Sequence, residues 1–337
     1  MKKWMIVVLT VILTIGLAAC SSAANLKSGA AAGEALIKMV PKASTGIVAL
    51  DVQRLMTTDS VVKALQDPKN KEKLDEFVKM SGIDPAKDIY YLGGGGQGAL
   101  QGAFEGGVIV SLRYDKAKLQ SLIKDKAPEA KEELYEGVTV YSHIDGDKAE
   151  SKTRLAFLDA THIVIGSETG VKGIIDVAKK KTESLAKNPE MMALIKRADK
   201  SGIFWGAFAI PPEAIKKGIE ASPQFKALEG VTGLVLSFDN RMNGILADIK
   251  TIGGTKDQNA NLASVLTGFR ALGAMATGKE PAVGELLNGI AITSGADYTD
   301  VSINIPNELL DKLGQMAKSK AGEFMKPKKD AEPEEKK

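Results

Sequence analysis

The stretch from Tyr91 to Gly107, YLGGGGQGALQGAFEGG, decides between two fold classes for this chain of 337 residues. Its glycines at 93, 95 and 98 fit the pattern G-x-G-x-x-G, and an apolar run precedes them. In a dinucleotide-binding fold that pattern joins a strand to a helix, whose N-terminus then faces the pyrophosphate of the cofactor. The same glycines also suit a turn between antiparallel strands, because glycine tolerates positive φ and close backbone approach.

The residues after Gly98 favour the turn. Only seven residues, ALQGAFE, separate Gly98 from the next pair of glycines, and one of the seven is Gly102. Such a segment makes two helical turns at most, which is too short for a helix that connects two parallel strands. We therefore interpret the stretch as a long hairpin loop between Leu92 and Val108, and we predict no cofactor.

The rest of the chain predicts an α+β fold of two tandem, similar halves, residues 38–184 and 185–322. Strand-like runs alternate with turns rich in Gly, Asn and Asp, which is typical of a largely antiparallel sheet with helices packed on one face. The runs occur in the same order in both halves: 45–50, 89–92, 108–114, 137–140 and 162–165, then 201–206, 234–238, 245–249, 289–292 and 300–303. Element order rather than residue identity carries this match, so the alternative is the loose self-similarity of any α+β protein.

The N-terminus has the parts of a secretory signal. Two lysines precede an apolar run from Trp4 to Ile15, which is shorter than the roughly 20 residues of a membrane span. The next motif, Leu17-Ala18-Ala19-Cys20, resembles the lipobox of bacterial lipoproteins. The resemblance implies that residues 1–19 are a signal peptide and that the sulfur of Cys20 carries diacylglycerol, which makes the lipid bilayer a partner. The alternative is an ordinary signal peptide with a chance cysteine.

The residues that follow the cysteine bear on location and flexibility. Ser21 stands where Asp favours retention in the inner membrane of enterobacterial lipoproteins, so the resemblance implies an outer-membrane protein that faces the periplasm. The cell surface and the inner membrane are the alternatives. We predict a lipidated cysteine and tether over residues 20–37. We also predict a disordered charged tail over 323–337, because its composition buries too little apolar surface to offset its ordering entropy.

Composition excludes several classes of function. Lys and Arg number 45 against 42 Asp and Glu, so no basic surplus points to a nucleic-acid partner. Cys20 is the only cysteine, and its lipidation leaves no thiol for disulfides, thiol catalysis or metal binding. Aromatic residues make up 5% of the chain, which favours no sugar-stacking platform. We interpret the densest aromatic group, Phe204, Trp205 and Phe208, as core, with a hydrophobic ligand patch as the alternative.

Two motifs resemble a phosphate-binding loop and a metal-binding site in part. The sequence Gly273–Glu280 follows G-x-x-x-x-G-K, but it ends in Glu instead of Ser or Thr and follows a helix, so we interpret it as a helix end. His143 lies close in sequence to Asp145, Asp147 and Glu150. A calcium-binding EF-hand loop that starts at Asp145 would need Gly at position 150, and it fails there. We predict no metal site, with a looser calcium site as the alternative.

A serine and a histidine are the remaining candidates for catalysis. Ser167 in the sequence GSETG does not fit the nucleophile motif G-x-S-x-G, and its place before an apolar helix predicts an N-cap. His162 alternates with Ile163 and Ile165, which places it on the solvent face of a strand. We expect that the protein is not an enzyme.

Three longer motifs carry a resemblance that covers most of residues 38–320. They are MVPKASTGIVALDVQRL at 39–55, GIDPAKDIYYLGGG at 82–95 and LAFLDATHIVIGSETGVKGIIDVAK at 155–179. They resemble a group of uncharacterised exported bacterial proteins, many of which are lipoproteins. The resemblance implies an exported α+β protein in two parts, and it implies no activity.

The functional expectation is a membrane-anchored envelope lipoprotein with a non-enzymatic binding or structural role. Its partner would be an envelope protein or the cell wall. The first alternative is a periplasmic carrier of an apolar ligand or lipid, held between the sheet and helices such as 255–276. The second is a hydrolase whose site is assembled from distant loops.

Overall fold

The computed structural model describes residues 28–98, 104–144, 153–241, 244–276 and 280–324. The first part of the chain contains, in order, α2 (Gly29–Ile37), β1 (Gly46–Asp51), α3 (Val52–Met56), α4 (Asp59–Gln66), α5 (Pro68–Ser81), α6 (Pro85–Asp88), β2 (Ile89–Gln97), β3 (Glu105–Leu112), α7 (Lys116–Lys126), β4 (Lys131–Tyr135), β5 (Val138–Ser142), β6 (Arg154–Phe157), β7 (His162–Gly166) and α8 (Glu168–Ala178).

The second part of the chain continues this alternation of strands and helices. It contains the 3₁₀ helix η1 (Leu185–Lys187), α9 (Pro189–Ile195), β8 (Phe204–Ala209), α10 (Pro212–Ala221), the 3₁₀ helix η2 (Pro223–Leu228), β9 (Val231–Arg241), β10 (Gly244–Gly253), α11 (Lys256–Ala276), α12 (Pro281–Asn288), β11 (Ile290–Ser294), β12 (Tyr298–Pro306) and α13 (Asn307–Phe324).

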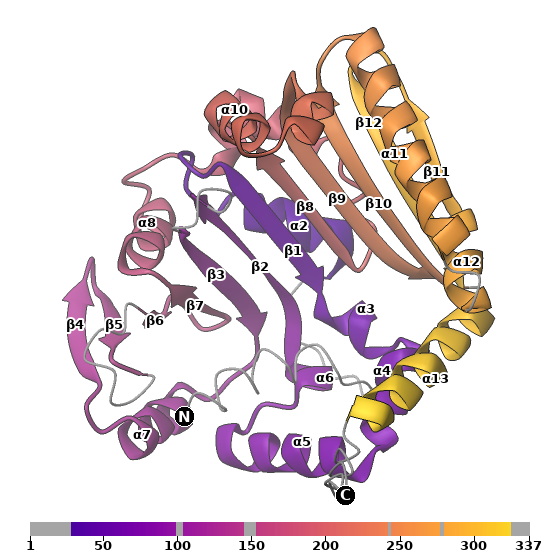
Figure 1. The fold of residues 1–337 in the computed structure, drawn as a ribbon. Coiled ribbons are helices and arrows are strands. Elements are labelled where there is room, and N and C mark those ends of the chain that lie inside the picture. The colour runs from indigo at the N-terminus through magenta and orange to yellow at the C-terminus, as the bar shows by residue number, and fades with distance from the viewer. Residues whose placement is uncertain (1–27, 99–103, 145–152, 242–243, 277–279, 325–337) are drawn as a thin grey trace, which may run out of the picture.

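The twelve strands of the described residues belong to one sheet, in the order β11-β12-β10-β9-β8-β1-β2-β3-β7-β6-β5-β4. Every pairing is antiparallel, which confirms the predicted α+β class. The pair β1–β8 lies inside the sheet and joins the two predicted halves (Figure 1). Outward from that pair the order is β2-β3-β7 on one side and β9-β10-β12 on the other. A duplication of the sequence itself stays a prediction.

The glycine run of the deciding stretch lies inside a strand. The predicted hairpin is present, because β2 pairs antiparallel with β3, but Gly93–Gly96 pair with both β1 and β3 instead of forming a loop. Close packing explains why these residues are glycines. A Cβ atom on Gly93 would lie 2.5 Å from Leu36 Cδ2, and one on Gly95 would lie 2.8 Å from Val40 Cγ1. The missing side chains therefore let α2 and the segment after it approach the sheet.

Residues 29–37 form helix α2, and the prediction of a tether over 20–37 is wrong for this segment. Leu36 and Ile37 of the helix are buried. Gly33 lets the helix pack closely on the sheet, since a Cβ atom there would lie only 3.1 Å from the hydroxyl oxygen of Tyr91. Residues 20–27 lie outside the described residues.

Two clusters of buried residues lie on opposite faces of the sheet. Successive residues of a strand point to opposite faces, so Ile47 and Ala49 of β1 belong to the first cluster and Leu50 packs against the second. The first cluster includes buried residues of α2, α8 and α9 and contains strand residues of both halves. The second includes residues of α3 to α7 and only first-half strands. Helices thus cover both faces of the first half, which differs from the predicted packing on one face.

Candidate functional site: an open apolar face

In the second half, one face of the sheet carries apolar side chains that no buried cluster covers. Directly paired residues of antiparallel strands point to the same face, so the register assigns these side chains to the face opposite the first cluster. We call them the open face: Phe204, Phe208, Leu234, Leu236, Phe238, Ile245, Ala247, Ile249, Ile290, Ile292, Val301, Ile303 and Ile305.

The side chains of the open face are incompletely covered. All of them are half-buried except Ile249, which is 40% exposed. On the same face of the first half, Leu50 and Leu92 pack against the second buried cluster. The difference follows from the positions of the helices. Figure 1 shows β8, β9 and β10 with no helix drawn in front of them, between α10 at one end and α13 at the other, while α2 lies behind them.

Helix α11 covers only the outer edge of this face. The hydroxyl of Thr299 on β12 donates a hydrogen bond of 3.1 Å to the carbonyl oxygen of Asn259. At the other end of the helix, the guanidinium of Arg270 donates to the carbonyl oxygen of Ile290, where β11 begins, at 2.5 Å. Leu262 is a buried apolar residue of this helix. These contacts hold α11 over β11 and β12 and leave β8 to β10 outside its reach.

One flank of α11 carries further apolar residues. Val265, Phe269 and Leu272 follow the spacing i, i+4, i+7 and therefore share one side of the helix. Phe269 is 57% exposed and Leu272 is 64% exposed. Val265 also lines a cavity of about 310 Å³, together with Lys226, Ala227, Glu229, Gln258 and Asn261. Three of these lining residues come from η2 or the turn that leads into β9, so this flank faces the β9 side of the helix.

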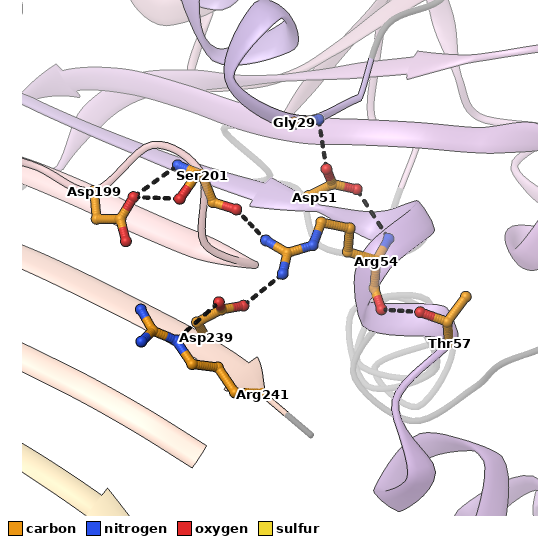
Figure 2. A network of polar contacts seen from close by, with 8 residues as sticks. All are labelled: Gly29, Asp51, Arg54, Thr57, Asp199, Ser201, Asp239 and Arg241. Atoms are coloured by element: carbon orange, nitrogen blue, oxygen red, sulfur yellow. Dashed lines mark hydrogen bonds and ion pairs between the residues drawn. The ribbon is translucent and has the colours of Figure 1, made fainter. Parts of the chain in front are cut away.

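A polar network at the end of β1 joins the two predicted halves (Figure 2). The carboxylate of Asp51, which is fully buried, accepts hydrogen bonds from the backbone N–H of Gly29 at 2.5 Å and of Arg54 at 2.9 Å. The Arg54 guanidinium donates to the carbonyl oxygen of Ser201 and pairs with Asp239 Oδ1 at 2.8 Å. The network thus connects the starts of α2 and α3 to β9 and to the segment before β8.

Several residues of the predicted sites lie outside the described residues. These are Cys20, the acidic residues Asp145, Asp147 and Glu150, and residues 277–279 of the motif G-x-x-x-x-G-K, which resembles a phosphate-binding loop. Lipidation and the looser calcium site therefore stay predictions. The preceding residues 273–276 are the last residues of α11, as the interpretation of a helix end requires.

The two candidates for catalysis have structural partners. The Ser167 hydroxyl accepts hydrogen bonds of 3.1 Å from the N–H groups of Gly170 and Gly106, which confirms the predicted N-cap of α8. His162 Nδ1 lies 2.9 Å from the carboxylate oxygens of Asp159. The hydroxyl of Thr161 also lies 3.1 Å from His162 Nδ1, and it donates a hydrogen bond of 3.0 Å to Asp159 Oδ1.

Burial and hydrogen bonding oppose each other at Asp159. Burial alone would raise the pKa of this carboxyl group, but hydrogen bonds from His162 and from the Thr161 backbone outweigh that effect and lower the pKa to about 2. The carboxylate is therefore held in its charged form, which suits a structural hydrogen-bonded pair at the start of β7.

The described residues contain neither a cluster of metal ligands nor a membrane-spanning helix. Within those ranges, no three His, Cys, Asp or Glu side chains gather closely enough to hold a metal ion. No helix of the same ranges combines the length and the apolar character that crossing a membrane requires.

The aromatic group of the second half is divided between the two faces of the sheet. Trp205 is fully buried in the first cluster, which confirms the interpretation as core for this residue. Phe204 and Phe208 alternate with it along β8 and belong to the open face, where they are half-buried. The alternation of apolar and polar residues from Asp300 to Ile305 in β12 is the sequence signal for such a face. It indicates one apolar side, and it does not indicate whether a helix covers that side.

Comparisons with known proteins give a family of unknown function. The model of a family described as "Protein of unknown function (DUF3352)" matches residues 114–270, which is less than half of the chain. This match agrees with the predicted resemblance to uncharacterised proteins. No curated protein matches the chain.

Among solved structures, three crystal forms of TP0453 are similar to this chain at 12% sequence identity. Form III has a TM-score of 0.47 and covers 84% of this chain and 97% of that chain. Form I has a TM-score of 0.45 with coverages of 84% and 96%. Form IV has a TM-score of 0.44 with coverages of 87% and 97%. At this identity, and with TM-scores below 0.5, the similarity carries no conclusion about function.

Proposed function

We propose that this protein is a membrane-anchored envelope lipoprotein without enzymatic activity, and that its second half binds an apolar ligand, a hydrocarbon chain, on the open face. The observation that supports the binding role is the open face itself, whose apolar side chains are incompletely covered in β8 to β12. Soluble monomers rarely leave contiguous apolar patches uncovered, and such patches mark interaction sites.

The chemistry of the open face favours hydrocarbon over a peptide. Its side chains are aliphatic or phenyl groups, which offer no hydrogen-bond donor or acceptor. Polar residues that the register places on the same side of the sheet, such as Asn240, Thr251 and Thr299, lie toward its two ends. A peptide backbone placed there would bury N–H and C=O groups without partners, at a cost of about 1–3 kcal/mol for each group. An acyl chain has no such groups, so each methylene that it buries contributes about 0.8 kcal/mol without this penalty.

Binding is tested with a fluorescent fatty acid such as cis-parinaric acid, titrated into the purified protein. We expect saturable binding to the wild type. Ile249→Asp should weaken binding at least tenfold, because a charge at the centre of the face must lose its hydration against hydrocarbon. The matched control is Leu134→Asp, which changes a strand leucine that is 75% exposed on β4 and should leave binding unchanged.

Mass spectrometry of lipid extracts from the purified protein gives a second readout. The wild type should carry noncovalent lipid that Ile249→Asp loses and Leu134→Asp retains. Equal binding by all three proteins, or no binding by the wild type, would contradict the proposed ligand.

The anchor is tested separately through Cys20. The resemblance to a lipobox supports acylation there, and two or more acyl chains hold a protein stably on a bilayer. We expect palmitate to label the wild type in cells, and Cys20→Ser to leave the membrane fraction. A Cys20→Ser protein that still sediments with membranes would argue against the anchor.

A further inference from the structure

The C-terminal end of α11 presents exposed apolar side chains to solvent. Phe269, Leu272 and Met275 are 57%, 64% and 81% exposed. The first turns of the same helix expose polar residues instead, among them Lys256 and Asp257. The exposed surface of α11 therefore changes from polar to apolar along its length.

The register of the sheet places this apolar helix end at a defined edge of the molecule. Arg270 bonds to the carbonyl oxygen of Ile290, the first residue of β11. Across the sheet, one row of directly paired residues leads from Ile290 to β1: Ile303, Ala247, Phe238, Phe204 and Leu50. The apolar end of α11 therefore lies at the end of the sheet where β1 finishes.

The described chain begins at the same end of the sheet. The backbone N–H of Gly29, the first residue of α2, bonds to the carboxylate of Asp51, the last residue of β1. Six strands stand between β1 and β11 inclusive, and neighbouring strands lie about 4.8 Å apart, so Gly29 and the apolar end are separated sideways by roughly 25 Å. Figure 1 shows α3 and α12 at this same end of the sheet. Helix α3 follows β1 in the chain, and helix α12 follows α11.

The segment before Gly29 limits how far this end can lie from a bilayer. About nine residues connect Cys20 to Gly29, and a fully extended chain spans at most about 3.6 Å per residue. If Cys20 is acylated, as the proposed function holds, then Gly29 lies within roughly 30 Å of the membrane surface. A connection of this length allows the end of the sheet that carries the apolar residues of α11 to reach the bilayer.

We propose that Phe269, Leu272 and Met275 dock this end of the protein on the surface of the lipid bilayer that holds Cys20. The inference rests on the anchor of the proposed function and adds a second, noncovalent attachment. Because Phe269 and Leu272 share the flank of α11 that faces β9, docking brings the open face to the membrane. A hydrocarbon chain can then pass from the bilayer to the open face without crossing water.

The test uses acylated full-length protein reconstituted into vesicles of phosphatidylethanolamine and phosphatidylglycerol. Cysteine is introduced as Leu272→Cys and, as a control on the same helix, as Ala260→Cys, which is exposed about 18 Å away along the helix axis. Each thiol is labelled with the fluorophore NBD, and a lipid that carries a nitroxide in its acyl chain serves as quencher. We expect a blue shift and several-fold stronger quenching at position 272 than at position 260. Equal, weak quenching at both positions would overturn the docking.

A second measurement separates this inference from the proposed function. The triple change Phe269→Ser, Leu272→Ser and Met275→Ser should slow transfer of a fluorescent fatty acid from vesicles to the protein several-fold. Its affinity for the same fatty acid in solution should stay within twofold of the wild type. Unchanged transfer would refute docking while leaving the open face as the binding site. Strong quenching at position 272 in a protein that binds no fatty acid in solution would support docking and refute the ligand.

Discussion

The indole nitrogen of Trp205 donates a hydrogen bond of 2.9 Å to the hydroxyl oxygen of Tyr91, and both side chains are buried. Trp205 belongs to β8 and Tyr91 to β2, and β1 lies between these strands. The bond therefore crosses the junction of the two predicted halves. Gly33 of α2 packs directly on the pair, since a Cβ atom there would lie 3.1–3.2 Å from both side chains.

Replacing Tyr91 with phenylalanine should destabilise the protein by about 1–3 kcal/mol, because the buried indole N–H of Trp205 loses its acceptor. Urea denaturation measures this loss. The neighbouring Tyr90→Phe, at a half-buried position of the same strand, is the control and should change stability by less than about 0.5 kcal/mol. Equal losses of stability in the two variants would contradict a stabilising role for this hydrogen bond.

Alkaline pH should weaken the protein through the same residue. Burial raises the pKa of Tyr91 from 10.0 to about 12, against the opposing effect of the bond from Trp205. Because the folded pKa lies above the unfolded one, this contribution to stability is complete below pH 10 and is lost as the pH rises toward 12. Denaturation at several pH values should give a shallower decline for Tyr91→Phe than for the wild type. Parallel declines would contradict the assignment.

Acid should act through Asp159, whose pKa the contacts with His162 and Thr161 lower from 3.8 to about 2. The folded pKa lies below the unfolded one, so this stabilisation is present above about pH 4 and is lost as the pH falls toward 2. The side chain is 50% exposed, so solvent screening keeps the effect modest. Thermal unfolding of Asp159→Asn should depend less on pH between 4 and 2. The expectation fails if the two pH profiles coincide.

Alanine at Gly93 should cost about 1–3 kcal/mol, because the new Cβ atom would lie 2.5 Å from Leu36 Cδ2 and 2.6 Å from the carbonyl oxygen of Val48. Gly218→Ala supplies the matched control. That glycine lies within α10, and a Cβ atom there would meet nothing within 4 Å. The control should therefore stabilise the protein by about 0.5–1 kcal/mol through its helix propensity. Chemical denaturation of both variants decides the matter, and a stable Gly93→Ala protein would show that α2 can move away.

The order of strands and helices could be predicted from the sequence because local patterns encode it. The segment Pro68–Ser81 shows this, since Asp67 caps its first turn and Gly82 ends it with a φ of +74°. The glycine run led to the wrong prediction of a loop, because neighbouring elements determine why these positions are glycines. Four glycines in a row are typical of a loop. Inside β2, the approach of α2 and of the segment after it explains Gly93 and Gly95, and the close backbone of β3 explains Gly94 and Gly96.

The open face could be predicted only in part. Alternation in β12, where Val301, Ile303 and Ile305 share one side, indicates a face that avoids water. Whether helices cover that face depends on contacts between distant segments. The polar network at the end of β1 shows the same limit, because Arg54 and Asp239 are 185 residues apart in the sequence.

The pairing of β1 with β8 also has a consequence for the order in which the protein forms. Gly46 pairs with Phe208, about 160 residues later in the chain, so β1 lacks this partner strand until the chain is available as far as β8. Throughout that interval β1 keeps an unpaired edge that can recruit a foreign strand. A chain that ends before β8 would therefore expose this edge of β1 to aggregation.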